Sequence, residues 1–425
     1  MFFKNRSSEN LCIACLTLIC APLIGVFLMF LAYCIPTNPI TFNVKNSLAI
    51  YRVEQKWYRW APPYFSSQLE NFGDAYLLSK AVFPVTEPLK DSMLGAKCET
   101  QRDEHPVIAL FDCLETADQS NTYRAETARY WSGSLTLLKP LLTIFTLSEI
   151  RILSMILQFF LLCLLVIQLH QKGGYKLLLP FLLGVCILNP ISCALSISFA
   201  PLYCITLLSC LILLKYNLYN SPKYWYFFLL IGIITIFFDQ FTYILVPLGF
   251  PLILFVLLNN EKTFLKMKKI IIASVSWGIG FSGMWLGKWL ASSLITGRNI
   301  FIEAFNQMKF RVGEDVYGKK ITSLDAVQEN LDALFACFPA QFYLFLLLGI
   351  TVWIILNFIR EYKIQFQKSI IFPLLLIGTY PFIYCAIIKN AAFIHQWMFY
   401  RMFALAVLGI IYIIVYSFKK NIISK

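Results

Sequence analysis

The stretch Glu70-Asn71-Phe72-Gly73-Asp74-Ala75-Tyr76-Leu77-Leu78 follows one long apolar run and precedes a series of others. It lies in the polar segment 36–133, which is rich in Tyr, Trp and Pro and too apolar for a disordered linker. Asp74 therefore stands close to a water–lipid boundary, where a membrane enzyme would hold an acid or a base. The same carboxylate could equally cap the apolar helical run that begins beside it.

The composition of the chain indicates an integral membrane protein. Of the 425 residues, 59% are hydrophobic and 14% are charged, more apolar surface than a soluble core needs. The first apolar run has no small-residue cleavage site and is interpreted as an uncleaved signal-anchor helix. Apolar runs long enough to predict spanning helices occupy residues 10–35, 150–169, 175–192, 196–214, 224–238, 242–258, 270–292, 338–359, 370–388 and 399–417.

The expected fold class is thus an all-α, polytopic membrane protein with about ten transmembrane helices and a large first extracytoplasmic loop that carries interfacial helices. Within the polar segments, helical patterns cover 71–82 and 123–131, and an interface-lying helix is expected over 134–147. The predicted order is a tail (1–9), helix 1 (10–35), a first external segment (36–147), helices 2–7 (148–292), a second external segment (293–336), helices 8–10 (337–417) and a tail (418–425).

Lysine and arginine predict the topology. They gather in the stretches 1–9, 170–176, 215–223, 259–269, 360–368 and 418–425, whereas the turns 193–195 and 239–241 have none. The positive-inside rule then places both termini in the cytoplasm and both long polar segments outside a cytoplasmic (inner) membrane. The net charge of +13 is accounted for in this way, so no nucleic-acid partner is expected. Cys98 and Cys113 share the first polar segment and could pair if it faces an oxidising compartment.

The predicted external boundary also collects the unusual polar residues of the chain. Charges near apolar helices are expensive and tend to face a cavity or a partner. Several cations with one or two carboxylates fit an anionic, phosphate-bearing ligand that is handled by an acid or a base. The candidate site residues are Asp74 together with Asn71, Arg129, Tyr130, Trp131, Lys139, Asp239, Lys288, Arg311, His395, Tyr400 and Arg401.

Most of these candidates also have a simpler structural interpretation. Asp239 could cap the helix that follows it, with help from Thr242. Lys288 could extend its amine to the interface, Arg129-Tyr130-Trp131 could be an interface anchor, and Arg311 could simply be solvated. Farther along, Arg401 could stack on Trp397 four residues earlier, and His395 would titrate close to neutral pH.

Several common chemical motifs are absent from the sequence. There is no Gly-rich phosphate loop followed by Lys-Ser/Thr, no His-Glu-x-x-His and no Cys-x-x-Cys. The three histidines are far apart in sequence, so neither a metal site nor a bound cofactor is expected.

The layout resembles the GT-C superfamily of membrane glycosyltransferases, an uncharacterised bacterial branch in particular. The resemblance covers the whole chain and rests on short motifs. These are Asp74 in Asn-Phe-Gly-Asp-Ala, Arg129-Tyr130-Trp131-Ser-Gly before Leu-Lys-Pro-Leu-Leu, Phe-Asp239-Gln-Phe-Thr, and the stretch from His395 to Arg401. In contrast to many members, this chain has one carboxylate where they have a tandem pair, which favours a metal-independent mechanism.

The resemblance implies an inverting transfer of a sugar from a polyprenyl-phosphate donor to an extracytoplasmic glycan or lipid-linked acceptor. Asp74 would be the general base, although Asp239 remains an alternative, and the cations Lys288, Arg311, His395 and Arg401 would hold the departing phosphate. The lipid tail would lie in a groove with Lys139 at its mouth.

Two other functions fit the same layout. A flippase for lipid-linked oligosaccharides, or another transporter, would place charges at mid-membrane depth instead of at one face. A non-catalytic subunit of cell-surface polysaccharide assembly would lack a coherent pocket. The sequence does not determine the sugar, the acceptor, the donor lipid or the oligomeric state.

Overall fold

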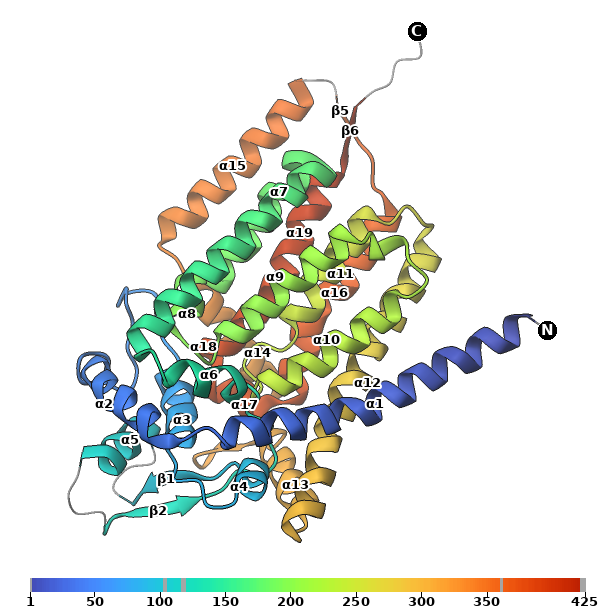
Figure 1. Cartoon of the computed structure of the whole chain (residues 1–425). Helices are drawn as coiled ribbons and strands as arrows, with labels where there is room; N and C mark the ends of the chain where they lie inside the picture. Colours follow the sequence, from blue (N-terminus) through green and yellow to red (C-terminus); the bar gives the residue numbers. More distant parts are fainter. Residues whose placement is uncertain (1, 102–104, 116–119, 360–361, 421–425) are drawn as a thin grey trace.

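The computed structural model describes residues 2–101, 105–115, 120–359 and 362–420, and this part of the chain is mostly helical. Long apolar helices form a bundle, and the short helices and strands of the polar segments gather at its ends (Figure 1). Within the described residues, six stretches are long and apolar enough to cross a membrane. They are Asn10–Tyr33 within α1 (Phe2–Tyr33), α7 (Leu147–Leu188), α12 (Thr263–Thr296), α15 (Ala340–Ile359), α16 (Lys368–Ile387) and the stretch Gln396–Tyr416, which ends in α19 (Ala404–Tyr416).

The predicted count of ten spanning helices is therefore not met. Two predicted spans fall in the single element α7, whose helical course is interrupted at Gly174 (φ 60°, ψ −155°). Three others correspond to the shorter apolar helices α9 (Ala200–Lys215), α10 (Tyr224–Phe238) and α11 (Val246–Leu258). The longest of these has 16 residues, which corresponds to about 24 Å at 1.5 Å per residue, less than a hydrocarbon core of about 30 Å.

The centre of the bundle is the apolar helix α11, whose residues from Val246 to Leu257 are all buried. A helix that is apolar on every side is expected in such a position. Beside it, α10 and α12 approach closely, because a Cβ atom at Gly232 would lie only 2.1 Å from the carbonyl oxygen of Trp277. Glycine is thus required where these two backbones meet.

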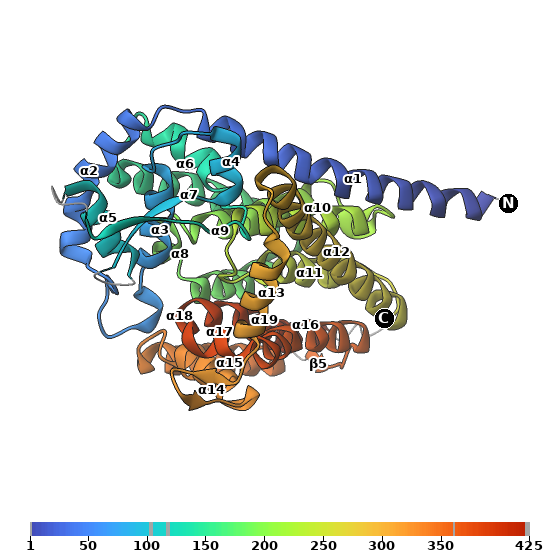
Figure 2. The ribbon, with the colours of Figure 1, turned by 90° about the horizontal axis from the view of Figure 1, so that it is seen from below.

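The first polar segment folds into a small layer at one end of the bundle (Figures 1 and 2). It consists of α2 (Thr37–Glu54), η1 (Phe65–Ser67), α3 (Asn71–Ala81), α4 (Pro88–Leu94), β1 (Lys97–Thr100), α5 (Pro106–Glu115), β2 (Thr122–Ala125) and α6 (Leu135–Leu142). The predicted helix over 71–82 is present as α3. The one over 123–131 is wrong, because its first residues pair antiparallel with β1, with Cys98 opposite Arg124.

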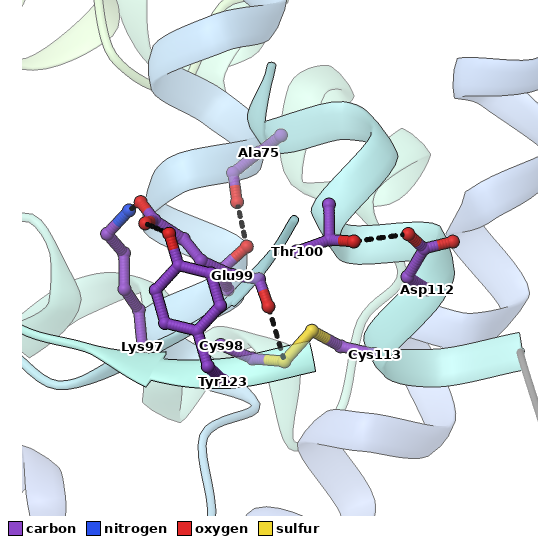
Figure 3. The surroundings of a disulfide bond; sticks show 9 residues. Ala75, Lys97, Cys98, Glu99, Thr100, Asp112, Cys113 and Tyr123 are labelled. Atoms are coloured by element: carbon purple, nitrogen blue, oxygen red, sulfur yellow. Dashed lines mark hydrogen bonds and ion pairs between the residues drawn. A yellow bond between two sulfur atoms is a disulfide. The ribbon is translucent and has the colours of Figure 1, made fainter. Parts of the chain in front are cut away.

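The Cys98–Cys113 pair forms a disulfide that joins β1 to α5 (Figure 3). Beside it, Thr100 Oγ1 donates a hydrogen bond to the Asp112 carboxylate at 2.7 Å. The hairpin and α5 are therefore fastened together at two neighbouring points.

Other segments complete the two ends of the bundle. We call the end that carries the first polar segment the site end. It also contains α8 (Pro190–Leu195), α13 (Ile300–Arg311), β3 (Asp315–Val316), β4 (Lys319–Lys320), α14 (Ser323–Phe335), α17 (Lys389–Ile394), α18 (Gln396–Phe399) and η3 (Tyr400–Phe403). The opposite end contains η2 (Leu218–Asn220), β5 (Tyr362–Ile364) and β6 (Phe418–Lys420). We call this second end the basic end, because the lysine-rich connections meet there. Lys172, for example, donates a hydrogen bond to the Asn217 side chain at 2.7 Å.

Both terminal tails differ in detail from the prediction. Helix α1 begins at Phe2, so residues 2–9 continue the first helix instead of forming a separate tail. The C-terminal tail begins in β6, which pairs with β5, and residues 421–425 lie outside the described part of the chain.

Candidate functional site

A cavity of about 400 Å³ lies at the site end of the bundle. Its walls come from the first polar segment, from the α10–α11 turn, from α13 and from the segment around α17 and α18. Its polar and charged lining residues include Glu70, Lys97, Glu99, Arg129, Asp239, Gln240, Gln307, Arg311 and His395, and its aromatic ones Phe72, Tyr76, Tyr130, Phe238, Phe241, Trp285, Tyr384 and Phe399. A cavity of this volume, lined by both polar and aromatic side chains, is typical of a ligand site.

Of the two carboxylates in the stretch 70–78, Glu70 is the one that lines the cavity. It occupies the N-cap of α3, where its Oε1 accepts a hydrogen bond from the Gly73 amide at 3.1 Å. Its Oε2 accepts a second one from Nε1 of Trp397 at 2.6 Å. Burial raises the pKa of Glu70 to about 7 against the effect of these two donors. A carboxyl that titrates near neutral pH is suited to exchange a proton with a ligand.

Asp74 lies one helical turn farther along and is not among the residues that line the cavity. It is fully buried, and its two oxygens accept hydrogen bonds from the backbone amides of Ile197 at 3.0 Å and Ser198 at 2.9 Å. Burial raises its pKa to about 6, although the guanidinium of Arg151 lies 3.9 Å away and favours the charged form. Asp74 thus ties α3 to the segment between α8 and α9.

Arg311 and His395 form a pair on the opposite wall. Nη1 of Arg311 lies 2.8 Å from Nε2 of His395. A guanidinium can only donate, so the imidazole nitrogen is the acceptor and His395 is neutral. Burial and the nearby Arg311 lower the pKa of His395 to about 3. The expectation that His395 titrates near neutral pH is wrong, because the histidine is buried against a permanent cation.

Arg129 and Tyr130 also line the cavity. The Arg129 guanidinium lies 4.7 Å from the centre of the Tyr130 ring, and its Nη1 donates a hydrogen bond to Glu303 at 2.6 Å. The carbonyl of Arg129 accepts hydrogen bonds from the indoles of Trp285 and Trp289. Arg129 is therefore held at the cavity by both its side chain and its backbone.

Asp239 lines the cavity and also caps the turn that leads into α11. Its carboxylate accepts hydrogen bonds from the amide and the hydroxyl of Thr242, at 2.9 and 2.6 Å. Burial raises its pKa to about 6. The predicted role as cap of the following helix is wrong, because α11 begins at Val246 with Leu245 at its N-cap, and Asp239 instead ends α10 and holds the turn through Thr242.

The hairpin supplies the outer end of the cavity. Lys97 and Glu99 flank the disulfide residue Cys98 and form an ion pair with each other (Figure 3). Tyr123 donates a hydrogen bond to Glu99 at 3.0 Å, and the Lys97 amine lies 4.5 Å from the centre of the Tyr76 ring. Burial and the charge of Arg129 lower the pKa of Lys97 to about 8.

The remaining predicted site residues are buried and do not line this cavity. The amine of Lys288 donates to the carbonyl of Met93 at 3.0 Å and lies over the Trp131 ring. That indole in turn donates to the Met284 carbonyl at 2.8 Å. The Lys139 amine lies 4.4 Å from the centre of the Tyr33 ring.

Residues Asn71, Tyr400 and Arg401 likewise connect parts of the structure. Asn71 donates to the carbonyl of Gln55 at 2.9 Å. Nε of Arg401 donates to the carbonyl of Leu188 at 3.0 Å, and its guanidinium lies 4.3 Å from the centre of the Phe199 ring and 4.9 Å from that of Tyr400. Among the described contacts, the expected stack of Arg401 on Trp397 is not formed: the guanidinium lies over Phe199 and Tyr400, and its Nη1 donates to the backbone carbonyl of Trp397.

Glu70, Lys97 and Glu99 line the cavity, although none of them is predicted from the sequence as a site residue. Glu70 stood in the quoted stretch, directly before the helical run, at the position that an N-cap occupies. Lys97 and Glu99 stood beside a cysteine that had been singled out. Their roles depend on how the hairpin folds back, which no local pattern shows.

The cavity offers two carboxylates with raised pKa values and two arginines between aromatic walls. This arrangement can bind a ligand that is part apolar and part anionic, and can take a proton from it. Among the described residues, no group of three or more His, Cys, Asp or Glu side chains is placed to hold a metal ion.

Comparison with known proteins adds no assignment. No protein-family model matches the sequence, and neither the curated proteins nor the solved structures give a match.

Proposed function

We propose that this protein is a GT-C-type membrane glycosyltransferase that moves a sugar from a polyprenyl-phosphate donor to an extracytoplasmic glycan or lipid-linked acceptor. The observation that carries the proposal is the cavity in which Glu70, with its pKa raised to about 7, shares one space with Arg311. An enzyme of this class needs a base for the acceptor and a cation for the leaving phosphate. The resemblance of the sequence motifs supports the same class.

In this proposal Glu70 takes the place of Asp74 as the general base. Both carboxylates are buried and hydrogen-bonded, but Asp74 is not among the residues that line the cavity. Glu70 lines the cavity, and a base with a pKa near the working pH is the most effective one. Asp74 then acts as a positioning residue behind the wall.

The reaction is a displacement at the anomeric carbon of the donor sugar. The acceptor hydroxyl gives its proton to Glu70 while its oxygen forms a bond to the anomeric carbon. The bond from that carbon to the phosphate oxygen breaks on the opposite face, and the phosphate leaves with the electron pair. Arg311, with Arg129 nearby in the same lining, stabilises the negative charge that grows on the phosphate. One displacement inverts the anomeric configuration.

The orientation in the membrane is part of the proposal. The disulfide Cys98–Cys113 supports an external site end, because disulfides persist in oxidising compartments. The lysine-rich connections at the opposite end agree with the positive-inside rule. The shorter helices α9, α10 and α11 would complete the crossings, with the turns at both ends making up the remaining thickness.

The decisive experiment measures sugar transfer by the purified, reconstituted protein from a polyprenyl-phosphate sugar. We expect Glu70→Gln to lower turnover by about 10²–10⁴-fold, the usual contribution of a general base. Glu87→Gln is the matched control, since Glu87 is exposed and lies outside the cavity. Asp239→Asn should cost less, because Asn keeps an acceptor for Thr242. Equal turnover of Glu70→Gln and wild type would exclude Glu70 as the base.

The two rival functions give different results in the same preparation. A flippase would move a lipid-linked sugar across the vesicle membrane without changing its covalent structure. A non-catalytic assembly subunit would neither transfer nor translocate the sugar. Either result would replace the glycosyltransferase proposal.

A further inference from the structure

A second hollow lies at the basic end of the bundle, away from the site cavity. It is an apolar groove of about 450 Å³ between the second half of α7, the helix α15 and the end of α19. Leu179, Leu183, Leu346 and Ile350 are among the residues that line it. The groove shares no lining residue with the site cavity, so an inference about it does not rest on the proposed reaction.

The protein covers this groove only in part. Just 6% of the apolar stretch of α15 is buried within the chain, and Phe345, which lines the groove, is 70% exposed. Apolar side chains so open to the outside are expected where a membrane helix meets lipid tails. Helix α15 lies at the outside of the bundle (Figure 1), and side chains of α7, α15 and α19 together line the groove.

One part of the groove lining is polar and aromatic instead of aliphatic. Tyr175 and Lys176 are exposed and line the groove together with Trp353, and Lys176 is the only charged residue among the described residues of this lining. Tyrosine, tryptophan and lysine are the residues that favour the membrane–water interface. The break in α7 at Gly174 directly precedes Tyr175 and Lys176, so it places both at the start of the apolar wall.

The dimensions suit one lipid chain. From Tyr175 to Leu183 the wall rises by about 12 Å at 1.5 Å per residue. A chain that enters at the interface would therefore run along α7 into the membrane. Its headgroup would remain beside Lys176, which has three N–H donors and can bind a phosphate while it keeps a contact within the protein.

We propose that this groove binds one anionic phospholipid of the leaflet at the basic end, with an acyl chain between α7, α15 and α19 and its phosphate at Lys176. Charge complementarity selects the anionic headgroup, because a lysine near a membrane surface attracts anionic lipids. The lipid fills the space that α15 leaves open and holds this helix against the bundle.

Gly349 offers a direct way to block the groove. It lines the groove, and a Cβ atom at this position meets nothing within 4 Å, so the side chain in Gly349→Leu begins in open space and takes up room that the lipid would use. Gly278 in α12 is the matched control. A Cβ atom there also meets nothing within 4 Å, and Gly278 lies outside the groove.

The test is native mass spectrometry of the full chain in mild detergent, with phosphatidylglycerol and phosphatidylethanolamine of the same acyl chains added in equal amounts. Wild type and Gly278→Leu should each retain one phosphatidylglycerol, and Gly349→Leu should lose it. Lys176→Gln, which keeps the groove open, should lower the preference for phosphatidylglycerol by about fivefold.

Three results would overturn the proposal. One is retention of the lipid by Gly349→Leu to the same extent as by wild type. Another is equal retention of both lipids by wild type, which would indicate a nonspecific lipid shell. The third is an unchanged preference in Lys176→Gln, the variant that guards against misfolding in Gly349→Leu.

Discussion

The indole N–H of Trp397 donates a hydrogen bond to Oε2 of Glu70 over 2.6 Å and connects α18 to the N-terminus of α3. This contact fixes the orientation of the carboxylate at the cavity. It also favours the ionised form, so the pKa of Glu70 stays lower than burial alone would set it. The residue that orients the proposed base is thus supplied by a segment far along the chain.

Removal of this donor should shift the pH dependence of the proposed reaction. In wild type, turnover should rise with pH through about 7, because Glu70 acts in its deprotonated form. Trp397→Phe removes a hydrogen bond to a charged group, so the pKa of Glu70 should rise by about one to two pH units. The midpoint of the pH–rate profile should move upward by the same amount.

Trp225→Phe is the control for this measurement, since Trp225 does not line the cavity. A loss of turnover in Trp397→Phe at all pH values, with the midpoint in place, would contradict the role of this contact. It would mean that Trp397 only supports the local packing.

Asp74 should behave as a structural residue. Asp74→Ala leaves the amides of Ile197 and Ser198 without an acceptor in a buried place. Each unsatisfied group costs about 1–3 kcal/mol, so the unfolding temperature in detergent should fall clearly. Asp74→Asn keeps one acceptor oxygen and should be the milder change.

The same two variants separate the two candidate bases. If Asp74 positions α3, the Asp74→Asn protein that remains folded should turn over sugar at a rate close to that of wild type. A loss of turnover as large as that of Glu70→Gln, at unchanged unfolding temperature, would return the role of base to Asp74.

The stretch 70–78 shows which parts of the structure a sequence can predict. The apolar runs and the helix over 71–82 follow from local periodicity, and α3 forms there. The resemblance of Asn-Phe-Gly-Asp-Ala to the GT-C motif favours Asp74 over Glu70, four residues earlier. Which of the two faces the cavity depends on the contact of α3 with residues 197 and 198, and a pattern within 71–82 contains no information on that contact.

The cations expected at the external boundary show the same limit. Lys288, Lys139 and Arg401 were grouped with Arg311 because all lie near the predicted external boundary. Depth in a membrane does not determine the direction of a side chain. The amine of Lys288 bonds the carbonyl of Met93, whereas Arg311 lines the cavity. Residue types and approximate depth were predictable, but convergence on one cavity required the tertiary fold.

Arg311 should be the main contact for the phosphate. Its partner His395 is neutral, and Arg311 forms no ion pair among the described residues. Its charge is therefore available to an anion. Arg311→Met should weaken inhibition by polyprenyl phosphate, the proposed product, by about 10–100-fold, the usual range for a hydrogen bond to a charged group.

Arg298→Met provides the comparison, since Arg298 is exposed and already paired with Glu126. Inhibition of this control should match that of wild type. Equal inhibition constants for Arg311→Met and wild type would contradict the proposed contact between Arg311 and the phosphate.

The disulfide makes the orientation of the chain testable. The chain has 13 cysteines, and two of them form the Cys98–Cys113 bond. After denaturation without a reductant, a maleimide polymer should therefore label eleven thiols, and after reduction it should label thirteen. Cys98→Ser leaves Cys113 unpaired, so it should give twelve under both conditions.

The same bond should stabilise the outer wall of the cavity. Its ends are 15 residues apart, and closure of such a loop is worth about 3 kcal/mol. Reduction should lower the unfolding temperature of wild type and leave that of Cys98→Ser unchanged. Because Lys97 and Glu99 flank Cys98 and line the cavity, reduction should also impair ligand binding there. Thirteen labelled thiols in wild type before reduction would contradict the bond and remove the support that it gives to an external position of the hairpin.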